Sequence, residues 1–327
     1  MDLSEISDID KEILMKLEYN FPFDPQPFKI ISEELKISEE ELLNRIKKLL
    51  EDGIVKRIGM YVSFRAKGMD GALIAARIPQ DKIEKFRKIA LGIKELTHNY
   101  VRDHPKYNIW FVLKASDRDT LNKNVKELLS QVDCNDYVIL YSKRTLKLSV
   151  KYDVIRGVSW SPNNTIKSLN KVPTAEELGI DKQLLTELSY PLKISQRPFK
   201  EIAEKHKMKE DELIELVREL YDKNVIKDYG ATLNGEKIGI VENGMVLLDT
   251  SNIEKTCEKL ALNIPEATHV VLRESNDEGW KYLCYSMIHA SRKETIRNVA
   301  NEISKETDSR SYMILFSLEN LKPGIVI

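Results

Sequence analysis

The feature that most constrains this chain of 327 residues is an internal repeat. Residues 10–59 align without a gap on residues 181–230, at a constant offset of 171 positions. About a third of the aligned positions are identical, and similarity at a fixed period is typical of a duplicated structural unit. After a short insertion in the second copy the match continues at an offset of 175. The sequence therefore predicts two copies of one unit in tandem.

Each copy begins with three short helical patterns and an extended segment. In the first copy the helical patterns cover residues 8–17, 28–35 and 38–52. Ser38 and Glu41 have the spacing of a capping box at the start of the third pattern. Apolar residues recur within that pattern at helical spacing. Three helices followed by a β-wing are typical of a winged helix-turn-helix domain.

The rest of each copy alternates strands and helices in the order βαββαβ, which is ferredoxin-like. The sequence therefore predicts an α+β protein, a tandem duplication of winged helix-turn-helix plus ferredoxin-like units. The expected divisions are winged helix-turn-helix 1 (1–65), ferredoxin-like domain 1 (66–152), a linker (153–172), winged helix-turn-helix 2 (173–238) and ferredoxin-like domain 2 (239–327).

Composition narrows the class of protein. The chain has 51 Lys and Arg against 52 Asp and Glu, and 42% of its residues are hydrophobic. It has no apolar run of the roughly 18–20 residues that a membrane span needs, so we expect a soluble protein with no membrane partner. Three widely spaced cysteines without a CxxC pattern argue against a disulfide scaffold and indicate a cytoplasmic location. We expect the cysteines to be buried apolar residues: Cys134, Cys257 and Cys284.

The third helical pattern of each copy is acidic. Residues 38–53 carry five acidic and three basic residues, and residues 209–224 carry six and three. In DNA-binding winged helices the third helix enters the major groove, where clustered carboxylates oppose the phosphates. We therefore expect no specific DNA binding.

The segment HNYVRDHPKYNIWF, residues 98–111, carries the most chemistry. On a strand, side chains at every second position share a face, so His98, Tyr100 and Arg102 are expected to project together. In the second copy, His269 and Arg273 occupy the matched positions. Such a face suits an anionic planar ligand, and the alternative is a polar face that seals a subunit interface. Further candidates are His104 near the hairpin tip and two residues of the return strand, Asn108 and Trp110.

The same motifs resemble a known family. HNYxRxH followed by YNxWF resembles the siroheme decarboxylases, which have the Lrp/AsnC fold and two related subunits. Residues 268–290, THVVLRESNDEGWKYLCYSMIHA, resemble the matching segment of the second subunit, with Val270 and Val271 in place of Cys and Tyr. The chain thus resembles a fusion of both subunits. The resemblance implies that the two halves pack through their sheets as an intramolecular pseudo-dimer with the linker on the surface. Further homo-oligomerisation stays open.

The resemblance also implies an activity. Siroheme decarboxylases remove two acetate carboxyl groups of siroheme, giving didecarboxysiroheme in the alternative heme biosynthesis pathway. No separate cofactor is implied, because the substrate carries the iron. The catalytic residues implied are His98, Tyr100 and His269, and either His98 or His269 is expected as an axial iron ligand. The expected substrate-binding residues are Arg102, His104, Arg273, Asn108 and Trp110 of the motif segments, together with Arg57 and Arg65. Arg57 and Arg65 flank the connection from the wing to the next strand, and the alternative for both is an ordinary solvated charge.

Other interpretations stay open at this point. The chain also suits a tandem Lrp/AsnC-like transcription regulator or a non-catalytic tetrapyrrole-binding sensor. The acidic third helices disfavour the regulator, but enzyme and sensor need the same pocket. The number of active sites and the order of the two decarboxylations stay open as well. We expect His206 and His289 to have structural roles.

Overall fold

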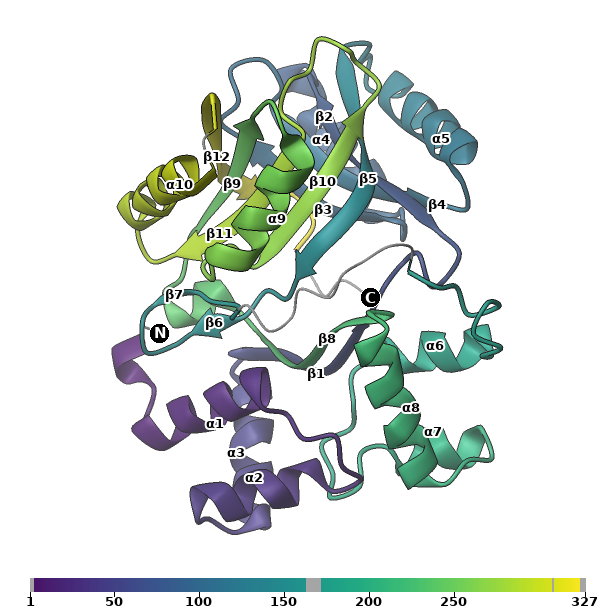
Figure 1. Ribbon diagram of the computed structural model, residues 1–327, viewed down its shortest axis with the longest axis vertical. Helices are drawn as coiled ribbons and strands as arrows, with labels where there is room; N and C mark the ends of the chain where they lie inside the picture. Colours follow the sequence, from purple (N-terminus) through teal and green to yellow (C-terminus); the bar gives the residue numbers. More distant parts are fainter. Residues whose placement is uncertain (1–2, 163–171, 308, 324–327) are drawn as a thin grey trace.

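The computed structural model describes residues 3–162, 172–307 and 309–323. A β-barrel with helices on its outer face lies above two helical domains, and a two-stranded sheet lies between the two parts (Figure 1). Each half of the sequence contributes one helical domain and half of the barrel. The architecture confirms the predicted α+β class and the tandem duplication.

Both helical domains have the predicted winged-helix order. Ser38 caps the third helix by accepting a hydrogen bond from the Glu41 amide at 3.1 Å, which is one half of the predicted capping box, while the Glu41 carboxylate accepts from Arg45 Nε at 3.0 Å. The first domain contains η1 (Leu3–Glu5), α1 (Asp8–Tyr19), α2 (Pro27–Leu35), α3 (Glu39–Glu51) and β1 (Val55–Val62). The second contains α6 (Lys182–Leu188), α7 (Lys200–Lys205), α8 (Glu210–Asp222) and β8 (Ile226–Leu233).

The two wings form one antiparallel sheet. Gly59 pairs with Gly230, and these residues are equivalent in the two copies, so the pseudo-two-fold axis passes through this pair. Gly230 has φ of +127°, and a Cβ there would lie 2.3 Å from the Leu17 carbonyl oxygen. Only glycine fits such a close approach of two backbones. The apolar cores of both helical domains merge beneath this sheet into a single cluster.

The ferredoxin-like halves have equivalent strand orders, β5-β2-β4-β3 and β12-β9-β11-β10. The first half contains β2 (Asp70–Ala76), η2 (Gln80–Lys82), α4 (Ile83–Leu91), β3 (Leu96–Arg102), β4 (Ile109–Ala115), α5 (Arg118–Ser130) and β5 (Tyr137–Leu148). The second contains η4 (Gly235–Ile238), β9 (Glu242–Asp249), α9 (Ile253–Asn263), β10 (His269–Ser275), β11 (Cys284–Ala290), α10 (Lys293–Thr307) and β12 (Ser311–Asn320).

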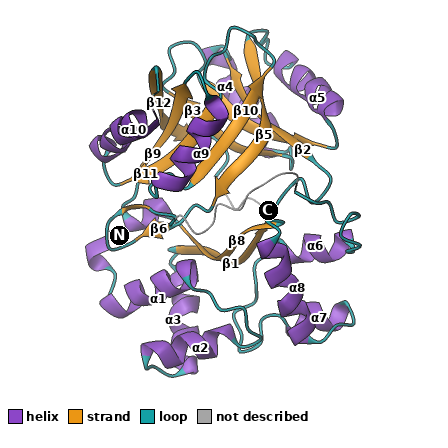
Figure 2. Cartoon of the chain, viewed as in Figure 1, coloured by secondary structure: helices purple, strands orange, loops and turns teal. Residues whose placement is uncertain are grey.

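The halves join edge to edge and close the barrel. Strand β3 pairs with β12, and β10 pairs with β5, so each half supplies two edges to its partner. Arg102 lies opposite Ser317 and Arg273 opposite Ser142, which are equivalent pairs in the two copies. The halves therefore contact each other through their sheets, as expected of a pseudo-dimer, and closure leaves no free sheet edge at either junction. Helices α4, α5, α9 and α10 cover the outside (Figure 2).

Apolar side chains fill part of the barrel interior. This inner cluster includes Leu73, Trp110, Leu140, Leu247 and Tyr285. Two separate apolar clusters pack between the barrel wall and its outer helices. The inner cluster does not reach the wing sheet, and the space between them is the cavity described in the next subsection.

The described part of the linker differs from the expected exposed segment. Strands β6 (Tyr152–Asp153) and β7 (Val158–Ser159) extend the barrel sheet, because β7 pairs with β11. Asp153, Ser159 and Ser161 are buried. Ile155, Arg156 and Pro162 are exposed, so residues 153–162 are packed in part, while residues 163–171 lie outside the described residues.

All three cysteines are buried, as predicted, but two of them form a bond that was not predicted. Cys257 of α9 and Cys284 of β11 form a disulfide bond with a Cα–Cα distance of 5.7 Å, whereas Cys134 is buried and free. Sequence spacing does not predict this pair, because the packing of helix α9 against strand β11 brings the two positions together. The disulfide removes part of the argument for a reducing compartment. Among the described helices, none has the length and apolar character that a bilayer-spanning helix requires.

Candidate active site

A cavity of about 320 Å³ lies between the barrel and the wing sheet. Its barrel side includes Trp110, Met245 and Tyr285, and its opposite wall is formed by residues of β1 and β8. Among the described residues the lining includes one carboxylate, that of Asp228, which pairs with Lys151 at 3.1 Å. Six basic side chains also line it: Lys56, Arg57, Arg102, Lys114, Arg273 and Lys322. The cavity is therefore strongly positive and suits a polyanionic ligand.

His98, Tyr100 and Arg102 all line this cavity, which agrees with the face predicted from strand alternation. A β-bulge interrupts the pairing of β3 with β4 between Thr97 and Tyr100. His98 lies in this bulge with φ of +48°, in the left-handed region that non-glycine residues rarely adopt. Its Nδ1 atom lies 3.2 Å from Thr97 Oγ1. Bulges re-aim side chains, and this one leaves the imidazole accessible from the cavity.

Arg102 is buried without a carboxylate partner among the described residues. Its guanidinium donates to Asn243 Oδ1 at 3.2 Å and to the Leu315 carbonyl at 3.0 Å, and it lies 5.0 Å from the centroid of the Tyr100 ring. Burial lowers the pKa of Arg102 to about 10, so the side chain stays charged at neutral pH. A buried cation without a counter-charge is costly, and an anionic ligand would offset that cost.

Arg273 repeats this arrangement at the equivalent position of the second half. It donates to the Leu140 carbonyl at 3.1 Å and lies 5.2 Å from the centroid of the Tyr285 ring. Its Nε atom is buried and has no partner among the described residues. Burial lowers the pKa of Arg273 to about 10. Two charged guanidiniums thus face one cavity with unused hydrogen-bonding capacity, which suits carboxylate recognition.

The repeat-matched histidines are neutral in this setting. Burial and the neighbouring Lys114 and Arg102 lower the pKa of His98 to about 4. Burial, His98 and Arg273 lower the pKa of His269 to about 3. A neutral imidazole can accept a proton or ligate iron through its unprotonated nitrogen. The described residues place no group of three or more His, Cys, Asp or Glu where it could hold a metal ion of its own.

His289, which we expected to be structural, also lines the cavity. Arg102 donates to Asn243 Oδ1, which orients that amide so that its Nδ2 donates to His289 Nε2 at 3.1 Å. The proton of the neutral ring is therefore on Nδ1, which is buried and has no partner among the described residues. Burial, Arg102 and Lys56 lower the pKa of His289 to about 3. In the aligned repeat, His289 is equivalent to Lys114, which also lines the cavity. This equivalence of two polar residues at matched strand positions was the sequence signal that could have identified His289.

Two predicted substrate contacts lie outside the cavity lining. His104 Nδ1 accepts a hydrogen bond from the Tyr107 amide at 2.9 Å, and its ring packs 5.9 Å from that of Trp280 in the other half. Asn108 holds Ile78 through two hydrogen bonds, with its Oδ1 accepting at 2.9 Å and its Nδ2 donating at 2.8 Å. Both side chains therefore stabilise the hairpin and the junction of the halves.

The remaining predicted contacts differ in position. Trp110 lines the cavity, and its Nε1 donates to the Tyr107 carbonyl at 2.9 Å. Arg57 also lines the cavity, but its guanidinium is already bonded to the Met60 and Ser189 carbonyls at 2.8 and 2.9 Å. Arg65 lies in a neighbouring pocket.

Comparisons with known proteins agree with this arrangement. A family model described as "Siroheme decarboxylase NirDL-like HTH domain" matches residues 10–55 and 181–226, and one described as "AsnC-like ligand binding domain" matches residues 66–147 and 237–322. The siroheme decarboxylase of Hydrogenobacter thermophilus is 30% identical over 97% of this chain and 93% of its own length. The chain belongs to the siroheme decarboxylase family.

Two further relatives of this family bear on the fused form. The siroheme decarboxylase alpha subunit of Desulfovibrio desulfuricans is 32% identical and matches 36% of this chain and 67% of its own length. The crystal structure of the siroheme decarboxylase NirDL in complex with an iron-uroporphyrin III analogue has a TM-score of 0.67 and 26% identity. That match covers 98% of this chain and 94% of the other. This chain therefore shares both of its halves with that solved member of the family.

Proposed function

We propose that this chain is a carboxy-lyase that removes two acetate carboxyl groups of siroheme, giving didecarboxysiroheme and two molecules of CO2. The observation that carries the proposal is the pair Arg102 and Arg273. These buried arginines occupy equivalent positions in one cavity, have no carboxylate partner among the described residues, and lie beside His98 and His269. Membership of the siroheme decarboxylase family supports the same substrate.

Polar and apolar groups of the cavity lining would contact different parts of the substrate. Siroheme is a macrocycle with several peripheral carboxylates, which Arg102 and Arg273 would pair with. The aromatic side chains of Trp110 and Tyr285 offer an apolar surface to the ring. The iron belongs to the substrate, so no separate cofactor forms part of the proposal.

The chemical step is the loss of CO2 from an acetate side chain. The bond between the methylene carbon and the carboxyl carbon breaks, CO2 leaves, and the electron pair stays on the methylene carbon, where the conjugated ring delocalises it. A proton then completes the methyl group. We assign proton delivery to His98, with Tyr100 as the alternative donor. The carboxylates of bound substrate would raise the pKa of His98 from its value of about 4 and so charge the donor.

His269 has a different expected role. It is the repeat equivalent of His98, but Val271 stands where the first half has Tyr100. We propose that His269 ligates the substrate iron or anchors the ring, since its low pKa keeps a nitrogen lone pair available.

Anaerobic incubation of the purified chain with siroheme, followed by mass spectrometry, tests the proposal. We expect the loss of one and then two CO2 units from the substrate. Siroheme that binds and is recovered unchanged would instead identify a tetrapyrrole sensor.

The regulator interpretation has weak support in the structure. On α3, Arg45 pairs with Glu41 at 3.0 Å and with Asp10 at 3.2 Å. On α8, Arg218 donates to the Phe23 carbonyl at 3.3 Å. These cations of the third helices are already engaged, so the proposal includes no specific DNA binding. A cytoplasmic location is also part of the proposal, and cell fractionation tests it.

A further inference from the structure

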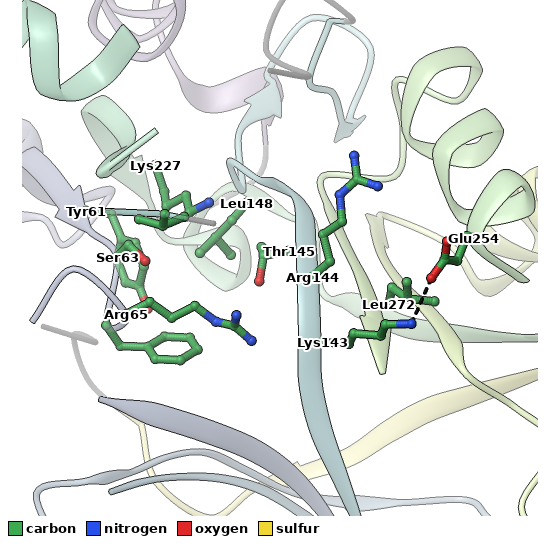
Figure 3. Close-up of a pocket in the computed structure, with 12 residues that line it drawn as sticks. Tyr61, Ser63, Arg65, Lys143, Arg144, Thr145, Leu148, Lys227, Glu254 and Leu272 are labelled. Atoms are coloured by element: carbon green, nitrogen blue, oxygen red, sulfur yellow. Dashed lines mark hydrogen bonds and ion pairs between the residues drawn. The ribbon is translucent and has the colours of Figure 1, made fainter. Parts of the chain in front are cut away.

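A second pocket of about 310 Å³ adjoins the cavity and shares Tyr61, Phe64, Thr145 and Leu148 with its lining (Figure 3). It lies between the wing sheet and the barrel strands β5 and β10. Four basic side chains line it: Arg65, Lys143, Arg144 and Lys227. None of the steps proposed above uses this pocket.

Two of these basic side chains form ion pairs with carboxylates and two do not. Lys143 pairs with Glu254, and Arg144 pairs with Glu258, each at 2.7 Å. Arg65 extends toward β5 and donates to the Ser142 carbonyl (Figure 3). Lys227 has no carboxylate partner among the described residues, and burial together with Arg65 lowers its pKa to about 7. The pocket therefore presents two basic side chains without a carboxylate partner among the described residues next to the cavity.

The duplication supplies an internal comparison. The pseudo-two-fold axis through Gly59 and Gly230 relates this side of the molecule to an equivalent side near β12 and β3. The aligned copies replace Lys227, Arg65, Lys143 and Arg144 with Lys56, Glu236, Leu318 and Glu319, respectively. The four positions thus carry four basic residues on one side, and one basic with two acidic residues on the other. The backbone is duplicated, but the charge pattern is not.

We infer that the pocket formed by Arg65, Lys143, Arg144 and Lys227 is a docking subsite for peripheral carboxylates of the tetrapyrrole, and that ligand enters and leaves on this side alone. The inference rests on the proposed function, because it takes a polycarboxylate tetrapyrrole as the ligand. A positive surface beside a cavity attracts anions and raises their association rate, whereas on the counterpart side Glu319 pairs with Arg87 and Lys56 faces Glu236, which leaves no excess of positive charge there. One chain therefore has one binding side and binds one tetrapyrrole, despite two equivalent halves.

Stopped-flow association with iron-uroporphyrin III tests the inference. The variant Arg65→Gln/Lys227→Gln removes the two basic side chains that have no carboxylate partner among the described residues. We expect its association rate at low ionic strength to fall on the order of tenfold, and its salt dependence to weaken, because the steering charge is gone. The matched control Glu236→Gln/Glu319→Gln removes two charges on the counterpart side and should not lower the rate. Replacing Arg65 also removes its hydrogen bond to the Ser142 carbonyl. The variant Lys143→Gln therefore tests the pocket at an exposed position, and we expect a smaller fall in its association rate.

The outcomes separate the inference from the proposed function. Equal rate changes for the two double variants, or two iron-uroporphyrin molecules per chain in a titration, would overturn the inference. If only the variants on the basic side lower the association rate, and the chain leaves siroheme intact, the docking subsite is supported and the proposed decarboxylase activity is refuted. A wild-type chain that binds no iron-uroporphyrin would refute both.

Discussion

Replacing His98 by asparagine separates its chemical role from its backbone conformation. His98 has φ of +48°, and asparagine is among the few residues that tolerate this region, so His98→Asn removes the imidazole and keeps the bulge. The ring makes a single hydrogen bond among the described residues, with Thr97 Oγ1 at 3.2 Å. We therefore expect the free energy of unfolding to fall by less than about 1 kcal/mol.

The expected kinetic effect is much larger. Loss of a positioned proton donor costs about 10²–10⁴ in rate, which corresponds to roughly 3–5 kcal/mol in the activation barrier. A pKa of about 4 leaves about one His98 in a thousand protonated at pH 7. Bound carboxylates must raise that pKa for the donor to work. The wild-type rate should therefore decline as pH rises through an apparent pKa above 4, and His98→Asn should lose this dependence.

Anaerobic single-turnover reactions with siroheme, quenched for mass spectrometry, measure this rate. Tetrapyrrole binding by His98→Asn, followed by absorption, should stay within a few-fold of wild type. The matched variant His269→Asn should retain more of the decarboxylation rate than His98→Asn. A wild-type rate in His98→Asn would refute the assignment and move proton delivery to Tyr100 or to the second half.

Three further predictions concern the arginines, the iron and pH. Arg102→Ala should chiefly raise the siroheme concentration needed for half-maximal rate, by roughly 10–100-fold, because a charge-assisted carboxylate contact is worth about 1.5–3 kcal/mol; an unchanged KM would remove Arg102 from the binding site. His269→Asn should shift the absorption spectrum of bound siroheme, and an identical spectrum would exclude His269 as the iron ligand. Burial lowers the pKa of His289 to about 3, against about 6.5 in the unfolded chain, so the unfolded state binds the proton first as pH falls. Stability should therefore decrease between about pH 6.5 and pH 3, by at most about 1.4 kcal/mol per pH unit for this residue. Urea titrations at pH 7 and pH 5 should show a smaller decrease in His289→Gln.

Local patterns in the sequence predicted a large part of the fold. The cap of α3 by Ser38 and the shared face of His98, Tyr100 and Arg102 depend on residues within a few positions of one another. Such short-range features follow from helical and strand periodicity. The constant repeat offset predicted the duplicated architecture for the same reason, since each copy encodes its own elements.

The site residues that the sequence missed depend on distant neighbours. Asn243 and His289 meet Arg102 only because β12 joins β3 and thereby brings the second half against the first. Conversely, His104 and Asn108 looked like ligand contacts, but local hydrogen bonds hold them in the hairpin. The spacing of residues along the sequence does not predict such partners. They are brought together by the packing of segments that lie far apart in the sequence.

By itself, the sequence determined two copies of a winged-helix and ferredoxin-like unit, an acidic third helix in each, and a polar strand face around His98. The tertiary structure alone decided that the two sheets close into one barrel, that Cys257 and Cys284 pair, and that the equivalent arginines face a shared cavity. Periodicity is set by neighbours along the chain. Barrel closure, burial and the pKa shifts that follow from it are set by contacts across more than a hundred residues, such as Arg102 with Leu315.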